Sequence, residues 1–489
     1  MLDAATLGSD GFAGVDAGAG TVTLNGSLFV DNLNESTRGK TLTLVSAESI
    51  SRKGGYTGIY AVVKALRDTN EEMADEADWM KLVVDVAADG SITAKMTTDN
   101  FSATGADYGA GVSDSFLSAL SWLSSGGSYG AFGIVNMAEA LEKDPQQYAL
   151  MNALSGLSSD QLADEVEKLS PSAFASMLAM PVEAFNADVA RIHARLDQRR
   201  YDGANPLRET GEYEFFVLAQ GDVAENGSGA DNPVFDYNLY GATAGVDWKP
   251  DYRSTLGLAF GYTYGKAKMR NGGGKVEMDD MRVTAFGSRL IGDRFYVDGG
   301  LQAGTAMFDT RRETVAGAAT GDTDAFFAGG FVTFGAVFTL SEDKKDGSGL
   351  YLMPNIGLSY LHESIDGFRE SGTAGLDMDD ADGDSLRARL AVALQWAFPF
   401  ETWQVRLGVE AAYAHDFLGE DIDLDGRFTA GGNAFGTTAA ALPTDVFSIG
   451  PTLDVGLTER DSLWLGYELE IDTDSGVSHG FNAGYRHRF

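Results

Sequence analysis

Three regions of the chain differ in how apolar and polar residues follow one another. Residues 1 to about 130 contain short strand-like runs, such as 41–45 and 81–86, which Gly, Asn and Asp separate. Short runs bounded in this way are typical of stacked strands or a sandwich. From about 136 to 200 apolar residues recur at helical spacing, and from about 212 onward apolar and polar residues alternate with period two. The second pattern predicts helices, and the third predicts strands with two unlike faces.

The C-terminal region contains twelve alternating runs. Twelve runs between residues 212 and 489 correspond to about 23 residues per strand and connection, whereas soluble all-β domains usually repeat every 8–12 residues. A strand that crosses a bilayer at a tilt needs about 9–11 residues, and these runs are long enough. The runs cover 212–222, 234–248, 252–268, 276–291, 293–310, 323–340, 348–363, 381–398, 402–417, 445–458, 461–472 and 476–489.

The connections between these runs alternate in length. Short connections follow the even-numbered runs, at 249–251, 292, 399–401 and 459–460, while the connection at 341–347 is somewhat longer and charged. With the exception of 473–475, longer or more polar connections follow the odd-numbered runs, at 223–233, 269–275, 311–322, 364–380 and 418–444. Turns on one rim and loops on the other are typical of an outer-membrane barrel with an even number of strands.

The run 381–398 indicates which face meets lipid. One face carries apolar residues from Leu386 to Phe398, and the other face carries Arg387 and Arg389. A small soluble barrel would turn its apolar face inward, but twelve strands enclose more volume than ordinary side chains fill. The apolar face is therefore expected to point outward, to lipid. The expected fold is all-β dominated, with a 12-stranded antiparallel transmembrane β-barrel.

Aromatic residues stand beside the short connections. Trp396 precedes the connection at 399–401 and Trp403 follows it, while Trp248 precedes the connection at 249–251. Repetition of this kind beside turns predicts an aromatic girdle at a membrane interface. The alternative for any one of these residues is packing in an ordinary core.

A helical segment at 181–200 precedes the first run and opens on Pro181. Its apolar residues step by three or four along one stripe. Arg191, Arg195 and Arg199 step by four along another line. At 1.5 Å per residue the segment is about 30 Å long, which matches the hydrocarbon thickness of a bilayer. Taken alone, the pattern also fits an amphipathic surface helix with solvated arginines.

Composition excludes several classes of function. The chain has 36 Lys and Arg against 72 Asp and Glu, a net charge of −36, which argues against sequence-independent binding to nucleic acid. It has no Cys, which excludes disulfides, zinc–thiolate sites and a Cys nucleophile.

Residues 1–5 have neither a basic nor an apolar segment, so no signal peptide is visible. The uncharged stretch 115–138 is rich in Ser and Gly, which predicts a buried connection rather than a spanning helix.

Two motifs resemble a catalytic site and a metal site but lack other residues that these sites require. Residues 476–480 match G-x-S-x-G, but only nine residues follow and none is the Asp that a triad requires. Residues 421–426 match the first half of an EF-hand loop, but Gly432 stands where the loop requires Glu. The five His residues form no pair with zinc spacing. We expect no catalytic residues, no metal site and no cofactor.

The C-terminus carries a resemblance to a known family. The last run, 476–489, ends in the sequence Gly480-Phe-Asn-Ala-Gly-Tyr-Arg-His-Arg-Phe489. This ending, the sequence Leu-Ser-Pro at 169–171, the helix at 181–200 and the twelve runs together resemble a classical monomeric autotransporter (type V secretion). The resemblance covers nearly the whole chain. It implies that Phe481, Tyr485 and Phe489 form the signal that the β-barrel assembly machinery reads.

The resemblance also implies an order of domains. Residues 40–47 resemble the closing rungs of a β-helical passenger, so 1–135 would be the C-terminal part of a β-rich passenger. Residues 136–205 would be a helical linker, and 206–489 the outer-membrane barrel. Because a passenger outside must reach the first strand through the pore, the helix is expected in the lumen. Its arginines would then pair with the inward residues Glu410, Glu468 or Glu470.

The implied function is an outer-membrane translocator that exports and anchors its own passenger at the cell surface. Its partners would be outer-membrane lipid, the assembly machinery, periplasmic chaperones and the passenger itself, with a monomeric barrel and no nucleic acid.

Asn186 is the one Asn of the helix, and the family includes members that cleave at such an Asn, although Ala187 breaks their paired-Asn pattern. Because an exported protein needs a leader, the chain is expected to be a truncated or processed piece. The alternatives are a helix-plugged channel or porin-like protein, and a surface enzyme whose catalytic passenger lies upstream.

Overall fold

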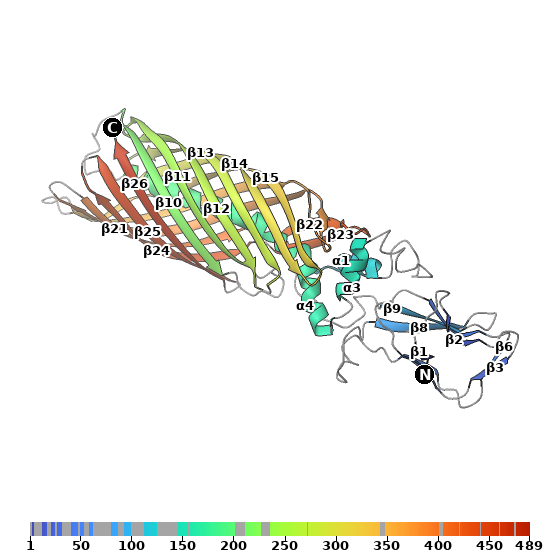
Figure 1. Cartoon of the computed structure of the whole chain (residues 1–489). Coiled ribbons are helices and arrows are strands. Elements are labelled where there is room, and N and C mark those ends of the chain that lie inside the picture. Colours follow the sequence, from blue (N-terminus) through green and yellow to red (C-terminus); the bar gives the residue numbers. More distant parts are fainter. Residues whose placement is uncertain are drawn as a thin grey trace.

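The structure is a computed structural model. It describes 112–124, 145–154, 157, 159–200, 211–225, 235–270, 272–342, 348–400, 404–419, 421–440, 442–458, 460–473 and 476–489, together with the backbone of nine short strands nearer the N-terminus. Within this part of the chain, a barrel of long antiparallel strands encloses a helix, and shorter helices lie at one of its ends (Figure 1).

Twelve strands form the barrel in the described residues, when β15 and β16 are counted as one strand interrupted at Val337. Each strand pairs with its neighbours in antiparallel register, and β10 pairs with β26 while β15 pairs with β17, so the ring is closed. The prediction of a 12-stranded antiparallel barrel is therefore confirmed. The strands are β10 (Tyr213–Glu225), β11 (Phe235–Asp251), β12 (Ser254–Met269), β13 (Gly274–Ile291), β14 (Phe295–Thr314), β15 (Gly317–Ala336) with β16 (Phe338–Glu342), β17 (Gly349–Ile365), β20 (Ala381–Pro399), β21 (Gln404–Asp416), β24 (Asp445–Gly456), β25 (Asp461–Asp472) and β26 (Val477–Arg488).

The apolar face of the barrel points outward, as the alternation predicts. Leu301 on β14 is 73% exposed and Leu390 on β20 is 56% exposed, whereas the inward residues Arg282 and Asp298 are buried. A water-soluble barrel would have the reverse arrangement. An outer surface of exposed Leu, Val and Phe fits a surface that lipid covers.

The connections at the long-loop end are more ordered than the sequence suggested. The segment 311–322 was expected to be a loop, but β14 and β15 continue through it as one hairpin that turns at Val315 and Ala316. The loops 364–380 and 418–444 contain a separate four-stranded sheet, made of β18 (Phe368–Arg369), β19 (Leu376–Met378), β22 (Asp421–Phe428) and β23 (Phe435–Ala440). We call this the loop sheet. Its acidic residues alternate with buried apolar ones such as Ile422 and Leu424, so one face is wet and the other is packed.

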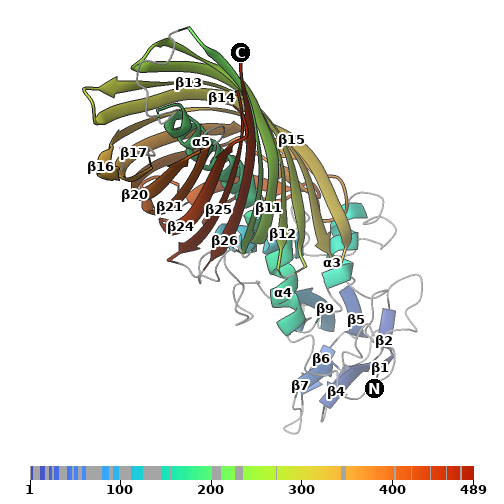
Figure 2. The ribbon, with the colours of Figure 1, turned by 90° about the vertical axis from the view of Figure 1, so that its left-hand side faces the viewer.

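Helices precede the barrel in the chain, and all of them except α5 lie at its long-loop end, opposite the C-terminus (Figure 1). They are α1 (Asp114–Ser124), α3 (Pro145–Leu154), α4 (Ser159–Leu169), the 3₁₀ turn η5 (Pro171–Phe174) and α5 (Ala175–Arg200). None of the described helices combines the length and the apolar composition that crossing a membrane requires. Figure 2 shows α5 inside the ring of strands.

The helix α5 starts earlier than predicted. The prediction placed its start at Pro181, but α5 begins at Ala175, so Pro181 lies inside it. A proline in the second turn removes one backbone donor and is tolerated at a cost. Burial explains why the helix extends upstream, because Met177, Leu178 and Met180 are all buried in the core at the long-loop end.

The first seven N-terminal strands pair in parallel with every third strand along the chain, whereas β9 pairs antiparallel with β5 and β8. Thus β4 pairs with β1 and β7, β5 pairs with β2, and β6 pairs with β3. A chain that returns to the same sheet every third strand follows the path of a coil, which is the pairing expected of a β-helix-like region. The strands are β1 (Leu2–Asp3), β2 (Phe12–Asp16), β3 (Thr21–Leu24), β4 (Ser27–Asp31), β5 (Thr41–Ser46), β6 (Ser49–Arg52), β7 (Gly58–Ala61), β8 (Met80–Val86) and β9 (Ile92–Thr98). The predicted domain boundaries at 135 and 205 lie outside the described residues.

Candidate functional site

The lumen of the barrel is the candidate site, and α5 occupies one side of it. The helix contacts β11, β12, β13, β14 and β17. Its buried residues Ile192 and Leu196 form an apolar cluster with the inward rings Phe216, Phe286 and Phe331. An apolar stripe on the helix therefore meets an apolar patch on the wall, which holds the helix away from the barrel axis.

The aromatic patch was not predicted from the sequence, although a signal for it exists. Phe216 stands directly opposite Gly245 on the next strand, and Phe286 stands opposite Gly257. Each ring lies over its glycine and leaves no room for a Cβ there. An inward Phe opposite a Gly therefore marks positions where a ring lies flat against the wall.

Asp188 anchors the middle of α5 to the wall. Its side chain is 2% exposed, and Thr243 donates to its Oδ1 at 2.9 Å while Gln302 donates to its Oδ2 at 3.1 Å. Arg191, one turn further along the helix, also donates to Asp188, and Arg282 lies 3.9 Å from Oδ2. A buried carboxylate needs such partners, because an unpaired charge in the interior is costly.

The other two arginines of the predicted line bind near the short-turn end. Arg195 Nε donates to Asp247 Oδ2 at 2.8 Å and Arg195 Nη2 donates to Glu214. Arg199 Nε lies 2.7 Å from Asp247 Oδ1, and Arg199 Nη1 lies 2.6 Å from Glu214 Oε1. All four side chains are almost completely buried. Arg195 and Arg199 thus face the strands β10 and β11.

These contacts correct the predicted partners. Glu410, Glu468 and Glu470 do not hold the helix arginines, and Glu410 instead accepts a hydrogen bond from Arg389 on the neighbouring strand. The physical reason is that α5 leans against the wall of β11 to β14, across the lumen from these glutamates. Spacing along a sequence does not specify which wall a helix contacts, nor how deep it lies.

A further cluster at the end of α5 was missed. Arg200 donates to both oxygens of Asp298 on β14, at 2.5 and 2.9 Å, and His193 Nδ1 lies 2.9 Å from Asp298 Oδ2. The guanidinium of Arg200 also lies 3.7 Å from the centroid of the Tyr296 ring. In the sequence, this cluster is signalled only by an inward Asp on a strand next to the end of the helix. Inward Asp residues are common in this barrel, so the signal does not single the cluster out.

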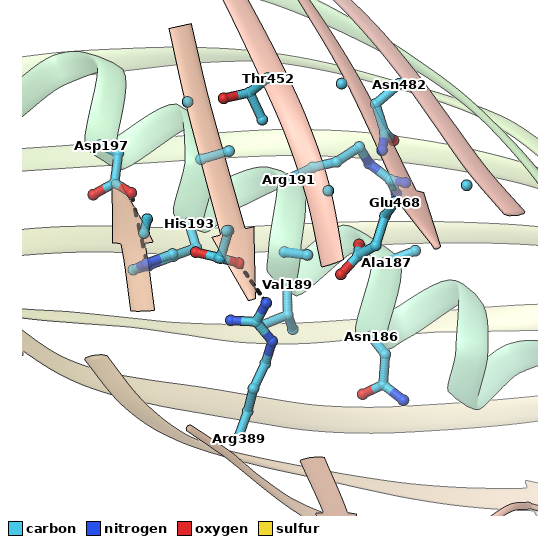
Figure 3. A pocket seen from close by; sticks show the side chains of 18 of the residues that line it. Asn186, Ala187, Val189, Arg191, His193, Asp197, Arg389, Thr452, Glu468 and Asn482 are labelled. Atoms are coloured by element: carbon cyan, nitrogen blue, oxygen red, sulfur yellow. Dashed lines mark hydrogen bonds and ion pairs between the residues drawn. The ribbon is translucent and has the colours of Figure 1, made fainter. Parts of the chain in front are cut away.

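A cavity of about 230 Å³ separates α5 from the opposite wall. Figure 3 shows Asn186 and Arg191 on the helix and Arg389, Thr452 and Glu468 on strands of that wall. The lining combines apolar side chains, such as Leu239 and Trp464, with charged ones of both signs, such as Arg389 and Glu468, so the cavity offers water several polar partners. Asn186 lines this cavity, and among the described residues nothing hydrogen-bonds its Nδ2. Its part in cleavage stays a prediction.

The long-loop end of α5 is joined to the shorter helices and the loop sheet. Arg312 on β14 is 1% exposed, pairs with Glu370, and donates to the carbonyl oxygens of Leu169 and Ala374, both at 2.8 Å. On α4, Glu165 Oε1 accepts from the amide of Val315 at the hairpin tip, at 2.5 Å. Burial raises the pKa of Glu165 above its ordinary value of 4.5.

The helix α1 packs on the edge of the loop sheet. Ser113, at the start of α1, accepts from the amide of Phe116 at 3.1 Å and donates to the carbonyl of Gly436 at 2.7 Å. The ring of Phe116 lies 5.0 Å from that of Phe435 and 5.3 Å from that of Phe428. We call α1, α4, η5 and the loop sheet the cap. Its apolar residues share one core cluster with the first half of α5.

The remaining predicted residues lie on the outside of the barrel. Trp248 and Trp396 are 37% and 38% exposed, and Trp248 stacks on Tyr213 with ring centroids 6.1 Å apart. Trp403 lies outside the described residues. On β26, Phe481 and Tyr485 are 57% and 39% exposed, and Phe489 just beyond it is 71% exposed. The structure places these side chains outward, and their roles as girdle and assembly signal stay predictions.

The two decoy motifs lie in strands. Residues 476–480 include the start of β26, and 421–426 belong to β22 of the loop sheet. An esterase elbow needs a strand-to-helix turn, and an EF-hand needs a loop between two helices. Neither context is present around these two motifs.

Comparison with known proteins gives a consistent result. Residues 215–468 match the family model described as the autotransporter beta-domain. No curated protein matches the chain. Among solved structures, the translocator domain of the autotransporter NalP from Neisseria meningitidis is similar, with 16% identity, a TM-score of 0.46, and coverage of 62% of this chain and 98% of that one.

Two further solved structures are similar to this chain. The beta domain of the Bordetella autotransporter BrkA has 16% identity and a TM-score of 0.42, with coverage of 57% of this chain and 100% of that one. The transport unit of the autotransporter AIDA-I from Escherichia coli has 11% identity and a TM-score of 0.43, with coverage of 60% and 97%.

Proposed function

From the premise that this chain belongs to the autotransporter family, we propose that α5 and the cap form the anchor that holds an exported passenger on its barrel. The family places the barrel in the outer membrane and makes it a translocator for its own passenger. Residues 215–468 are accordingly a translocator rather than an enzyme. What the proposal adds is the division of this chain into passenger, anchor and barrel.

One observation carries the proposal. The helix α5 occupies the lumen, and the segments at its two ends lie at opposite ends of the barrel. Its N-terminal end joins the cap at the long-loop end, and its C-terminal end precedes β10, which starts at the short-turn end. A chain that runs through the barrel in this way has its upstream part on the side of the long loops, which is the cell surface in an outer-membrane barrel.

The anchor has three fixed points along its length. The cap binds Arg312 at the surface, Asp188 binds the wall in the middle, and Arg195 and Arg199 bind Glu214 and Asp247 at the short-turn end. Each point buries a charged group together with its partners. Removing one partner from a buried pair typically costs about 3–5 kcal/mol, so the three points together resist extraction of the helix.

Epitope tags test the orientation in intact cells. One tag is placed at the N-terminus, one in the turn at Gly317 and one in the turn at Gly292. Both glycines have positive φ and open space around them, so insertion is tolerated. We expect antibody to reach the first two tags on intact cells and the tag at Gly292 only after permeabilisation. If the N-terminal tag is hidden while the tag at Gly317 is reached, the passenger is not exported through this barrel.

Measuring the ion conductance of the barrel distinguishes a helix that serves as an anchor from a protein that serves as a channel. The cavity beside α5 is the one observation that favours a channel. We expect little conductance from the intact protein in a planar bilayer, and a large increase when residues 175–200 are deleted. Equal conductance in both proteins would favour the channel.

We also propose that Phe481, Tyr485 and Phe489 contact the barrel assembly machinery, and that periplasmic chaperones deliver the chain to it.

A further inference from the structure

One carboxylate joins the seam of the barrel to the helix inside it. Glu214 lies on the first strand, β10, and is 1% exposed. Arg488, directly opposite on the last strand, β26, donates from Nε to Glu214 Oε1 at 2.8 Å. Arg199 of α5 lies 2.6 Å from the same oxygen, and Arg195 donates to the other oxygen. Contacts across the seam and contacts to the helix therefore share one group.

The neighbouring strand adds a second carboxylate to this group. Asp247 on β11 stands directly opposite Glu214, so β26, β10 and β11 place Arg488, Glu214 and Asp247 in one row. Like charges directly opposite each other destabilise a sheet. Both helix arginines, Arg195 and Arg199, contact both carboxylates. They offset a repulsion between Glu214 and Asp247 to which the contacts of Arg488 and Arg486 with Glu214 do not extend.

Burial makes the two sets of contacts depend on each other. A buried ion pair repays its desolvation only if further hydrogen bonds satisfy the remaining lone pairs. Glu214 offers about four such positions. Arg488 and Arg195 each donate a hydrogen bond to it, and Arg199 and Arg486 add ion-pair contacts at 2.6 and 3.8 Å. Without the helix, Glu214 loses the hydrogen bond from Arg195 and the ion pair with Arg199 and faces the open lumen, where an exposed ion pair with Arg488 contributes less to stability.

We propose that seating of α5 locks the seam between β10 and β26, with Glu214 as the positioning residue through which the helix acts. A barrel whose helix is not seated closes on its backbone ladder and on Arg488 over a repelling pair of carboxylates. A barrel whose helix is seated cannot open its seam without exposing the buried arginines of the helix. The proposal concerns this equilibrium, and it holds whichever way the passenger is exported.

A double-mutant cycle on the full-length protein, folded in detergent, tests the coupling. The variants are R199Q, R488Q and their combination, and the measurement is the denaturant midpoint of the barrel. We expect the double variant to lose clearly less stability than the sum of the two single losses. The matched control pairs R200Q with R488Q. Arg200 sits next to Arg199 on the helix but binds Asp298 on β14, so this pair should be additive. Additive losses in both cycles would overturn the proposal.

Amide hydrogen exchange gives a local readout that a general loss of stability does not mimic. In R199Q we expect exchange to rise about tenfold in β10 and β26 relative to β14 and β15. In R200Q the seam strands should keep their protection. If a glutamine variant does not fold, R199K and R488K keep the charge and lose the forked geometry, and they serve in the same comparison. Uniform exchange changes in all strands of R199Q would contradict a lock at the seam.

Discussion

The guanidinium of Arg312 donates from Nη1 to the main-chain carbonyl oxygen of Leu169 at 2.8 Å. Leu169 is the last residue of α4, where the carbonyl groups of a helix lack partners and carry partial negative charge. The same guanidinium pairs with Glu370 in the loop that contains β18. One buried side chain of the barrel thus binds a helix end and a loop, and fixes the cap to β14.

Replacing Arg312 by Met should release the cap. The change leaves Glu370 buried without its charged partner, which typically costs about 3 kcal/mol or more. We expect a lower denaturation midpoint and faster proteolysis of the segment 159–175 in the folded protein. Arg311 provides a matched control, because it is the adjacent residue and its pair with Glu313 is about half exposed. Arg311→Met should change stability by about 0.5 kcal/mol or less, and equal effects of the two changes would contradict this role of Arg312.

A charge on the outer face should destabilise the barrel only within the hydrocarbon region. Leu301 lies outward in the middle of β14 and is 73% exposed. Leu301→Arg is expected to cost about 2–4 kcal/mol in a bilayer. Val315 is an exposed apolar residue at the tip of the same hairpin, so Val315→Arg should cost much less. Refolding into vesicles and titration with urea measures both. Similar costs at the two positions would mean that lipid does not cover Leu301.

Removal of the terminal ring should impair assembly. Phe489 is 71% exposed at the end of β26, and we expect Phe489→Ala to lower the amount of protein in outer-membrane fractions. Protein that is already inserted should still present its passenger, because the lumen contacts are unchanged. Phe447, an exposed ring on β24, is the control, and Phe447→Ala should insert normally. Normal outer-membrane levels of Phe489→Ala would argue against an assembly signal.

Glu165 should make cap stability depend on pH. Burial raises the pKa of Glu165 above its ordinary value of 4.5, so the folded cap binds the proton more tightly than the unfolded chain does. The resulting stabilisation is complete below pH 4.5 and is lost as the pH rises through the raised pKa. Protease susceptibility of α4 should therefore increase over this interval. Glu165→Gln should remove that increase, and an unchanged pH profile in this variant would refute the role.

The barrel could be predicted from the sequence because the alternation of residues that specifies it lies within each strand. In every strand, alternation separates a lipid face from a wet face, and residues such as Leu390 and Arg389 show it directly. The number of strands follows from counting such runs. The continuous hairpin of β14 and β15 was missed because polar residues on both faces, as at 311–322, occur in loops and in strands that leave the membrane.

The helix in the lumen was predicted, but its partners were not. The spacing of Arg195 and Arg199 shows that they share one line of the helix, and says nothing about which wall that line faces. The wall is selected by the rings of Phe216 and Phe286, which lie far away in the chain. Arg312 was missed for the same reason, since its partners Leu169 and Glu370 are 143 and 58 residues distant.

The shared core of the cap has a consequence for how such proteins diverge. Phe116 of α1 packs against Phe428 and Phe435 of the loop sheet, so a change on one side of this contact alters the fit on the other. Natural variants should therefore accumulate paired replacements at these positions. A hybrid made by fusing a foreign surface protein to this barrel should retain residues 112–200 as an indivisible unit.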